Sequence, residues 1–490
     1  MPQPDRIDLH AIARSAMGQY GFQPFFPKAV IREVEALDEA AVLGNPPDSV
    51  ADLRGLLWSS IDNADSLDLD QLEFCEPAAG GEIKVKVAIA DVDAYVARAS
   101  RTDEHAAKNG TSVYTGIETF PMLPQRLCTE LTSLLAGQAR LAVIIEYTVL
   151  SDGTCRYGAV YRGLVRNQAK LVYEETGDWL EGSGAIPETV RRTAGLEAQL
   201  RLQDQAAQRL RARRLRQGAL ELEIIEARAV IKDETVQDMI VPKINRARQV
   251  IENFMIAANE TIVGFLDKAD VPMIQRVVRA PRDWQGIVAI AAASGTSLPA
   301  EPDPVALSAF LKERKAADPE RFPDLSLAVV KLLGPGEYAM LAPGQTSAGH
   351  FGLAVLDYTH STAPNRRYAD MIIQRLVKCA IQRNSCPYTE KQLSDLAARC
   401  TERDKFAKKV ERFMRKAEAA VLLSGRLNET FDAIVTGASA KGYYARIIAP
   451  PAEGRIMRGG DGLRVGQKIR IRLVNMDPYK GFIDFERVHS

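Results

Sequence analysis

The sequence predicts a multidomain α+β protein: a small helical module at residues 1–50, a large α+β body at 51–425 and a β-barrel at 426–490. Three observations support this prediction. A chain of 490 residues is too long for one ordinary hydrophobic core. Helical and extended patterns are mixed through its middle, and only short strand patterns follow Leu427.

The first 50 residues contain two helical patterns, at 9–20 and 27–37, joined by a turn at Gly18–Gly21. Two short helices around a glycine turn indicate a module similar to a helix-turn-helix. It either contacts nucleic acid or packs on the next domain, and the small number of basic residues favours packing. The cluster Gly44-Asn45-Pro46-Pro47 predicts a linker.

The middle of the chain predicts both strands and helices. Alternating apolar residues indicate strands, at 81–92, 142–151 and 158–165. Helical spacing indicates helices at 196–217, 246–266, 351–383 and 389–423. The helix at 196–217 has an arginine-rich second half, which either binds phosphates or forms a solvated face: Arg209, Arg211, Arg213, Arg214 and Arg216.

After Leu427 the pattern changes to five short strands separated by glycines, which indicates an OB-type barrel, a fold that binds single-stranded nucleic acid. This part has ten Lys and Arg residues against seven Asp and Glu, a net charge of +3. Five aromatic residues are candidates for stacking on bases or for filling the barrel: Phe431, Tyr443, Tyr444, Tyr479 and Phe482.

Composition indicates where the protein is located in the cell but says little about its function. Lys plus Arg equals Asp plus Glu at 63 each, so net charge does not indicate a nucleic-acid partner. The six cysteines show no zinc-like spacing and predict reduced thiols in the cytoplasm. No apolar run approaches the roughly 20 residues of a membrane span, and the N-terminus has no signal-peptide pattern. We expect a cytoplasmic monomer without a membrane partner.

The segment WSSIDNADSLDLDQLEF, at 58–74, concentrates carboxylates at Asp62, Asp65, Asp68 and Asp70. Clustered carboxylates repel one another and therefore need either water or a cation. Mg²⁺ prefers such oxygen ligands, and paired metals suit phosphodiester hydrolysis. A solvated acidic loop or a structural calcium loop is the alternative explanation.

The spacing of Asp62, Asp68 and Asp70 resembles the catalytic aspartate cluster of the ribonuclease II and R (RNB) family of 3′→5′ exoribonucleases. The family pattern has a fourth aspartate directly after the third, where this chain has Gln71. The resemblance implies an RNB catalytic domain at 51–425 and an S1 domain at 426–490. It also implies that the three aspartates are catalytic and bind Mg²⁺, or Mn²⁺.

Three further segments carry the same resemblance. The segment at 106–134 implies that Tyr114 stacks against RNA near its 3′ end. The segment at 350–375 implies that Arg366 contacts the scissile phosphate, with Arg367 and His360 as supporting or RNA-contacting groups. The segment around 401–404 places Glu402 near the RNA.

The implied function is processive, Mg²⁺-dependent hydrolysis of single-stranded RNA from its 3′ end to nucleoside 5′-monophosphates. Gln71, as a substrate-contacting neutral amide, would weaken one of the two metal sites. Two alternatives belong to other classes. One is a weakened protein that binds RNA 3′ ends, and the other is a DNA phosphodiesterase on a similar scaffold.

Overall fold

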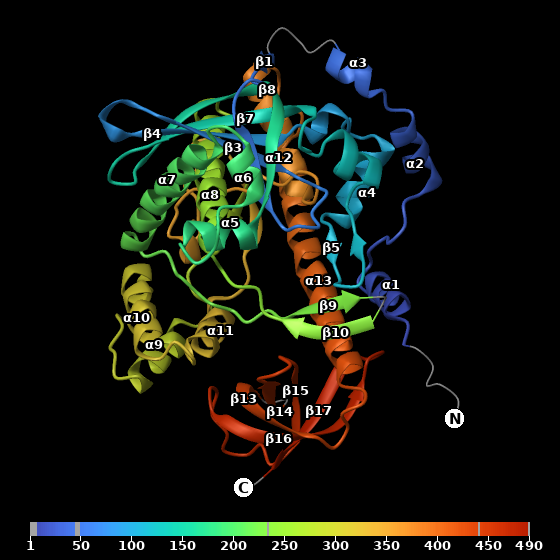
Figure 1. Cartoon of the computed structure of the whole chain (residues 1–490), viewed down its shortest axis with the longest axis vertical. Coiled ribbons are helices and arrows are strands. Elements are labelled where there is room, and N and C mark those ends of the chain that lie inside the picture. Colours follow the sequence, from blue (N-terminus) through green and yellow to red (C-terminus); the bar gives the residue numbers. More distant parts are fainter. Residues whose placement is uncertain (1–6, 45–49, 233–234, 440–441, 489–490) are drawn as a thin grey trace.

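The computed structural model describes residues 7–44, 50–232, 235–439 and 442–488. A large mixed body lies at one end of the molecule and a small barrel at the other, joined by one long helix, α13 (Glu390–Leu422) (Figure 1). The mixed α+β architecture and the five-stranded C-terminal barrel confirm the predicted fold class.

A six-stranded sheet forms the centre of the body, in the order β1-β8-β2-β3-β4-β7. Strand β8 also pairs with β7, so the sheet curls back on itself. Strand β8 runs parallel to β1 and β2 and antiparallel to β7. The strands are β1 (Val50–Asp52), β2 (Trp58–Asp62), β3 (Gln71–Pro77), β4 (Ile83–Ala90), β7 (Ala139–Val149) and β8 (Cys155–Val172).

Helices pack on the sheet through its apolar side chains. Helix α8 contacts β7 and β8, and Phe254 of α8 meets Tyr147 of β7 edge to face, both fully buried. Helix α7 packs on α8 and on β3. The helices of the body are α4 (Arg101–Asn109), α5 (Tyr173–Leu180), α6 (Glu188–Arg192), α7 (Leu196–Arg216), α8 (Arg246–Lys268) and α12 (Tyr368–Gln382).

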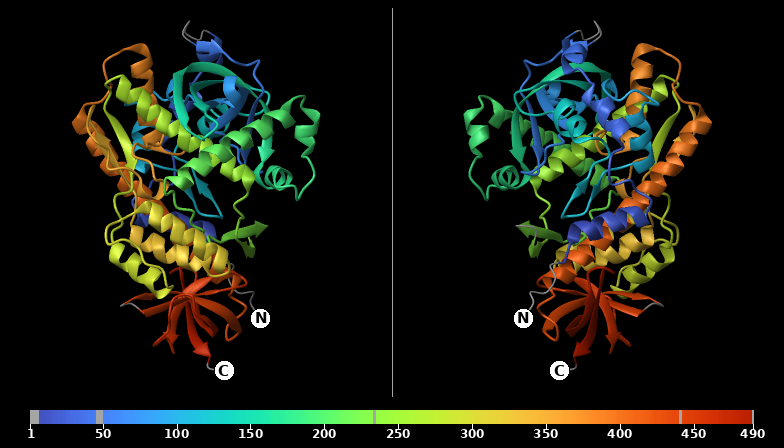
Figure 2. Two further views of the ribbon diagram at one scale, coloured as in Figure 1. Left: turned by 90° about the vertical axis from the view of Figure 1, so that its left-hand side faces the viewer. Right: turned by 90° about the vertical axis from the view of Figure 1, so that its right-hand side faces the viewer.

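A three-helix unit with its own apolar core lies between the body and the barrel: α9 (Trp284–Ala293), α10 (Pro304–Ala317) and α11 (Phe322–Leu333). Both views of Figure 2 show this yellow unit directly beside the red barrel. Asp324 of α11, almost fully buried, accepts a bond from Arg446 of the barrel at 3.0 Å. Two short sheets connect these parts: β9 (Arg228–Lys232) with β10 (Thr235–Ile240), and β11 (Met273–Val277) with β12 (Glu337–Leu341).

The N-terminal helices pack against the rest of the chain. Helix α1 (Leu9–Gln19) lies on α13 in a shared apolar core, and α2 (Lys28–Glu35) lies on α4. Helix α3 (Glu39–Gly44) follows. The predicted linker at 44–47 lies, apart from Gly44, outside the described residues.

The C-terminal strands close into a barrel in the order β13-β14-β15-β17-β16. All five predicted strand patterns form strands, and alternate apolar residues such as Ile471, Leu473 and Phe485 are fully buried inside. The strands are β13 (Thr430–Ser439), β14 (Gly442–Ile447), β15 (Glu453–Arg458), β16 (Lys468–Asp477) and β17 (Phe482–Val488).

One predicted helix is wrong in its first half. Residues 351–353 form a single 3₁₀ turn, and the chain from 354 to 367 is mostly irregular until α12 begins at Tyr368. The apolar residues of this stretch pack from an irregular backbone: Phe351 lies against the core of α9–α11, and Val355 and Tyr358 lie against Ile256 of α8. No helix among the described parts of the chain is long and apolar enough to cross a bilayer.

A buried ionic network fixes α12 to the sheet and generates a stability prediction. Asp91 has no exposed side-chain surface and lies 2.7 Å from Lys378 Nζ and 3.0 Å from Arg162 Nε. Asp91→Ala leaves the buried Arg162 without its carboxylate and leaves Lys378 with Asp93 alone, so we expect the free energy of unfolding to fall by about 3 kcal/mol. Urea denaturation of the purified chain measures this change.

The matched control is Asp395→Ala, which breaks the exposed pair with Lys391 at 3.2 Å. Solvent screens that pair, so its loss should cost less than about 1 kcal/mol. Equal effects of the two substitutions would contradict the assignment of Asp91 as a buried anchor.

Candidate active site

The acidic segment forms a tight loop between β2 and β3. Asp62 ends β2, and its Oδ1 accepts hydrogen bonds from the amide of Asn63 and the hydroxyl of Ser66, both at 2.7 Å. These contacts bend the chain directly after the strand. The loop therefore begins at a fixed point of the sheet.

Two other elements hold the same loop. Lys170 of β8 donates to the carbonyls of Ala64 and Ser66. The hydroxyl of Ser133 donates to the carbonyl of Leu67 and accepts from the amide of Leu69. The backbone of Asp68 and Asp70, which flank Leu69, is thereby held in place by these contacts.

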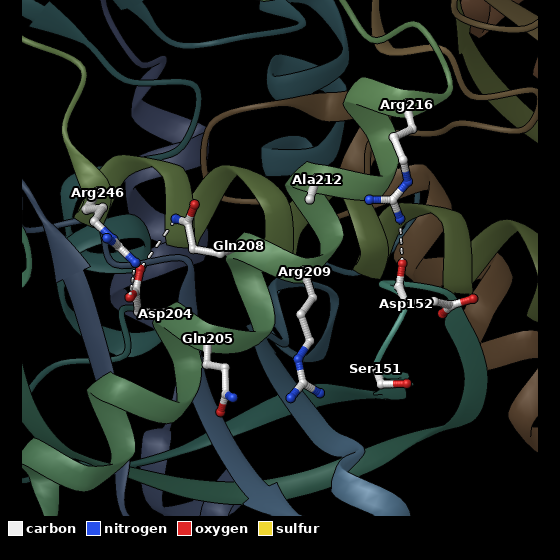
Figure 3. A pocket seen from close by; sticks show the side chains of 9 residues that line it. All are labelled: Ser151, Asp152, Asp204, Gln205, Gln208, Arg209, Ala212, Arg216 and Arg246. Carbon is white, nitrogen blue, oxygen red and sulfur yellow. Dashed lines mark hydrogen bonds and ion pairs between the residues drawn. The ribbon is translucent and has the colours of Figure 1, made fainter.

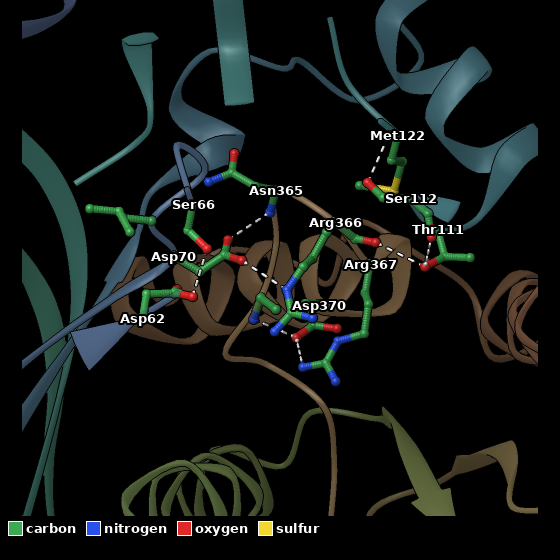
Figure 4. A network of polar contacts seen from close by, with 12 residues as sticks. Asp62, Ser66, Asp70, Thr111, Ser112, Met122, Asn365, Arg366, Arg367 and Asp370 are labelled. Atoms are coloured by element: carbon green, nitrogen blue, oxygen red, sulfur yellow. Dashed lines mark hydrogen bonds and ion pairs between the residues drawn. The ribbon is translucent and has the colours of Figure 1, made fainter. Parts of the chain in front are cut away.

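The centre of the site is a contact between Asp70 and the segment around Arg366 (Figure 4). The amide of Asn365 donates to Asp70 Oδ1 at 3.0 Å, and Arg366 Nε lies 3.3 Å from Asp70 Oδ2. The side chain of Asp70 is 2% exposed, whereas that of Arg366 is 46% exposed. The guanidinium thus contacts a buried carboxylate and still faces solvent.

Asp370 holds the arginine segment, the residues 363–367 that contain Arg366, through hydrogen bonds. Its fully buried Oδ1 accepts from the amide of Ala363 and from Arg367 Nη2, both at 2.8 Å. Arg367, predicted to bind substrate, is therefore ion-paired at the start of α12. His360, the other supporting candidate, is bound to the hydroxyl of Tyr338 at 2.8 Å and lies within the scaffold.

A third segment joins the arginine segment through its backbone. The amide of Ser112 and the hydroxyl of Thr111 both donate to the carbonyl of Arg366, at 2.9 and 3.0 Å. The amide of Tyr368 donates to the carbonyl of Gly110. The residues directly before Tyr114 are thus bound to the residues around Arg366.

Tyr114 lies in a two-stranded hairpin, β5 (Val113–Tyr114) and β6 (Thr119–Phe120), with a 42% exposed side chain. Its hydroxyl bonds to Asp68, which opposes the rise in pKa of that carboxyl. The ring is therefore at the carboxylate cluster and open to solvent. This position suits stacking on a terminal base.

Two carboxylates of α13 hold this hairpin and were not predicted from the sequence. Glu411 Oε1 accepts from the amide of Tyr114 at 3.3 Å. Glu418 lies against Gly116, whose φ is +80° and where a Cβ would approach Glu418 Oε1 to 2.2 Å. On a helix of alternating charge, nothing in the sequence separates these two residues from solvated neighbours.

Burial and mutual repulsion raise the carboxyl pKa values of the site. Burial raises the pKa of Asp70 to about 7, against the opposing effect of Arg366. Burial, with repulsion from Asp62, also raises the pKa of Asp68. Glu73 is fully buried, its pKa is raised well above its ordinary value by burial, and neither carboxyl oxygen has a partner among the described residues. The site therefore has more acid than local positive charge.

The other predicted residues are Asp65, Glu402 and Gln71, which directly follows Asp70. Gln71 begins β3 as a buried residue paired with Ile89 of β4, whereas Asp65 is exposed. Glu402 lies on α13 with a 57% exposed side chain, ion-paired with Arg403. The predicted place of Glu402 near the RNA stays a prediction.

The donor set of Asp62, Asp68 and Asp70 fits a hard divalent cation in chemistry and charge. The carboxylate of Asp62 raises the pKa of Asp68, and that of Asp68 raises the pKa of Asp70. Within the described ranges, however, no three His, Cys, Asp or Glu side chains converge closely enough to hold an ion. Arg366 is the cation that partly neutralises Asp70 here.

The aromatic residues of the barrel that were predicted to stack on bases differ in their exposure to solvent. Phe431 is buried in the shared apolar core, whereas Tyr479 is 61% exposed in the turn between β16 and β17. Only part of the predicted aromatic set is therefore available to a ligand.

A buried site with carboxylates and an arginine, in a mixed body followed by an OB-type barrel, defines a class of nucleic-acid-processing hydrolases. The RNB domain matches residues 50–383, and the RNase II-type exonuclease C-terminal S1 domain matches residues 429–488. The chain belongs to the RNB domain family. The matches support a 3′→5′ exoribonuclease, a hydrolase, as its enzyme class.

Ribonuclease R of Aquifex aeolicus is 27% identical to this chain, over 96% of the chain and 69% of that relative. Among solved structures, Mycoplasma genitalium RNase R in complex with ribose methylated single-stranded RNA superposes with a TM-score of 0.86 at 20% identity, covering 98% of this chain and 78% of that one. Yeast Ssd1, described as a pseudonuclease, has a TM-score of 0.65 at 16% identity, with 95% and 57% covered.

Glu418, which lies against the Tyr114 hairpin, leads to a prediction about how stability depends on pH. Burial raises the pKa of Glu418 to about 8 from an ordinary value of 4.5. Between these values the folded chain keeps a proton that the unfolded chain has lost, so the free energy of unfolding decreases as pH rises. Glu418→Gln removes this dependence. We expect equal stability near pH 5 and a variant more stable by about 3 kcal/mol near pH 8, measured by thermal unfolding.

The control is Glu402→Gln on the exposed surface of the same helix. This substitution should leave the free energy of unfolding unchanged near pH 5 and near pH 8, relative to the unmodified chain. A Glu418→Gln chain that lost stability at both pH values would contradict the protonated state assigned to Glu418.

Proposed function

We propose that this protein hydrolyses single-stranded RNA from the 3′ end, processively, to nucleoside 5′-monophosphates. The observation that carries the proposal is the convergence of three distant segments. Asp70, Arg366 and the hairpin of Tyr114 meet at one place, joined by the hydrogen bonds of Asn365 and Ser112. The family and its ribonuclease R relatives support activity on RNA.

Each residue has a role that its position permits. Asp62, Asp68 and Asp70 would hold Mg²⁺, or Mn²⁺, which supplies Lewis acidity toward the phosphate and lowers the pKa of water. Arg366 moves its exposed guanidinium from Asp70 toward the scissile phosphate and offsets the charge that develops there. Tyr114 seats the terminal base beside Asp68.

The substrate is an unpaired strand, because the exposed ring of Tyr114 can stack only on a base that is free of its partner. The relative from Mycoplasma genitalium was solved with single-stranded RNA and also with double-stranded RNA. We further propose a monomer that acts in the cytoplasm.

A second candidate function is the capture of RNA 3′ ends without efficient cleavage. Gln71 is the observation that favours it, because a neutral amide replaces the fourth carboxylate of the family pattern. An amide oxygen binds a metal more weakly than a carboxylate does. The structural likeness to Ssd1, a pseudonuclease, gives this candidate a precedent within the fold.

Asp70→Asn separates binding from cleavage. The asparagine keeps an oxygen for the amide of Asn365 but loses the charge that a metal and Arg366 need. We expect cleavage to fall by at least about a thousandfold, while RNA binding stays within a few-fold. A 5′-labelled strand with Mg²⁺ should give a descending ladder with the unmodified chain and an intact band with the variant.

A single internal cut would contradict the exonucleolytic mode, and turnover by Asp70→Asn would contradict the role of Asp70. An intact band with the unmodified chain as well would favour the end-binding candidate.

Gln71→Asp tests the weakened metal site. Restoring the carboxylate should lower the Mg²⁺ concentration needed for half-maximal cleavage by about tenfold, because a charged oxygen replaces a neutral one. Cleavage measured across a Mg²⁺ titration, with direct Mn²⁺ binding in parallel, checks the prediction. An unchanged metal dependence would refute the effect assigned to Gln71.

A further inference from the structure

The arginine-rich half of α7 is the one basic motif of the sequence that the active site does not use. The structure divides its five arginines into two groups. Arg211 is ion-paired with Glu221, and Arg214 lies 3.4 Å from Glu252 and bonds to Asn253 Oδ1 at 2.8 Å. These two have carboxylate partners of their own.

The other three, Arg209, Arg213 and Arg216, have no carboxylate partner among the described residues, and we call them the arginine stripe. Arg209 Nη1 donates to the carbonyl of Gly81 and Arg216 Nη2 to that of Asp152, both at 2.7 Å. A backbone carbonyl accepts a hydrogen bond but leaves the full positive charge of the guanidinium. The stripe therefore keeps an excess of positive charge.

Two carboxylates face the stripe, Glu260 and Asp152. Glu260 lines a hollow together with Arg213 and interacts with it electrostatically. Asp152 uses its two oxygens on the amide and the hydroxyl of Thr154, at 2.8 and 2.9 Å. Even if both carboxylates are counted in full, three cations against two anions leave a local charge of about +1. This excess is not visible in the net charge of the whole chain, which is zero.

The three residues of the stripe leave α7 on one side, where Arg209 and Arg216 border one hollow and Arg213 borders another, and the turn of Gly153 packs on Arg209 and Arg213. The residues of the stripe are four and three positions apart, which corresponds to about 6 and 4.5 Å along the axis and to a narrow arc around it. Like charges at this spacing repel, and a polyanion that lies along the helix would remove the repulsion. A linear ligand with closely repeated negative charges fits this arrangement.

The stripe is also preorganised by two turns. The turn around Gly153 packs on α7 so closely that a Cβ there would lie 2.2 Å from the carbonyl oxygen of Arg209. That turn presents the carbonyl bound by Arg216, and the turn at Gly81 presents the one bound by Arg209. Guanidinium groups held in this way lose less conformational entropy when a ligand binds.

A hollow of about 460 Å³ runs along this side of α7 (Figure 3). Arg209 and Arg216 border it, and the figure shows Gln205 and Ser151 on the same side. Arg246, also at its edge, is neutralised by both oxygens of Asp204. The lining is polar apart from Ala212, which suits a phosphate–sugar backbone better than a lipid surface.

We propose that the arginine stripe is a second RNA-binding site, which takes backbone phosphates of the substrate away from the catalytic centre. The proposal rests on the proposed function only for the identity of the polyanion. Strand β3 runs seven residues from Gln71 toward the turn at Gly81, so the stripe lies on the order of 20 Å from the site. Only RNA longer than the catalytic centre requires can occupy both.

The test compares RNA lengths in the full chain. A triple variant, Arg209→Gln with Arg213→Gln and Arg216→Gln, is measured for binding to a short oligo(A) and to long poly(A), in an Asp70→Asn background that prevents cleavage. We expect affinity for poly(A) to fall at least about tenfold, with the salt slope reduced by about 2, since each single-strand phosphate contributes about 0.7. Affinity for the short oligo(A) should stay unchanged.

Two controls separate charge from folding. Arg191→Gln with Arg192→Gln and Arg201→Gln removes the same charge from exposed positions already paired with Glu188 or Glu197, and it should leave poly(A) binding unchanged. Replacing the stripe by three lysines keeps the charge and should restore most of the salt slope.

An equal loss for both RNA lengths, no loss for either, or a loss of binding only to anionic vesicles would overturn the proposal. Cleavage of the short RNA by the unmodified chain is scored separately. If that cleavage is absent, the proposed catalytic function fails, and the length-dependent binding still decides the role of the stripe.

Discussion

The contact between Asp70 and the Arg366 segment is the constraint on which the arrangement of the site depends. A carboxylate with 2% of its side chain exposed needs hydrogen-bond donors, and two of them come from residues almost 300 positions later. Because the amide of Asn365 is one of them, the backbone of that segment is fixed as well as its side chain. The Tyr114 segment then joins through the carbonyl of Arg366. One buried charge therefore organises three parts of the chain.

Helix α13 holds the segments around this site in position. Its first half contacts β12, and its middle and last turns hold the Tyr114 hairpin through Glu411 and Glu418. It also carries α1 on its surface and leads directly into β13 of the barrel. The position of the Tyr114 hairpin is thus coupled to the element that places the barrel. A substitution in α13 can change RNA binding without touching RNA.

The site contains more carboxylates than cationic side chains, and a bound cation would offset this excess of negative charge. Asp62, Asp68, Asp70 and the buried Glu73 lie near one ion-paired arginine, Arg366. Burial raises the pKa values of Asp68, Asp70 and Glu73, and repulsion from neighbouring carboxylates adds to this rise. Gln71 makes the excess smaller than in the family pattern by one charge. The arginine stripe has the opposite imbalance on the far end of the same sheet. An RNA strand supplies negative charge for the arginine stripe, and its divalent ions supply positive charge for the acidic site.

The sequence by itself determined the long helices α7, α8 and α13, the strands of the barrel and the chemistry of the acidic segment, whereas the unit α9–α11 and the strands β9–β12 were not predicted. Long periodic patterns gave α7, α8 and α13 nearly to the residue, and the glycine-separated strands gave the barrel, because apolar periodicity is a local property. The aspartate spacing and its resemblance gave the family. Only the tertiary structure decided that residues 354–367 are irregular, that Glu411 contacts the Tyr114 segment, and that Asp370 holds the arginine loop. Those facts depend on which side chains meet across hundreds of residues, and a buried charge finds its partner through space rather than along the chain.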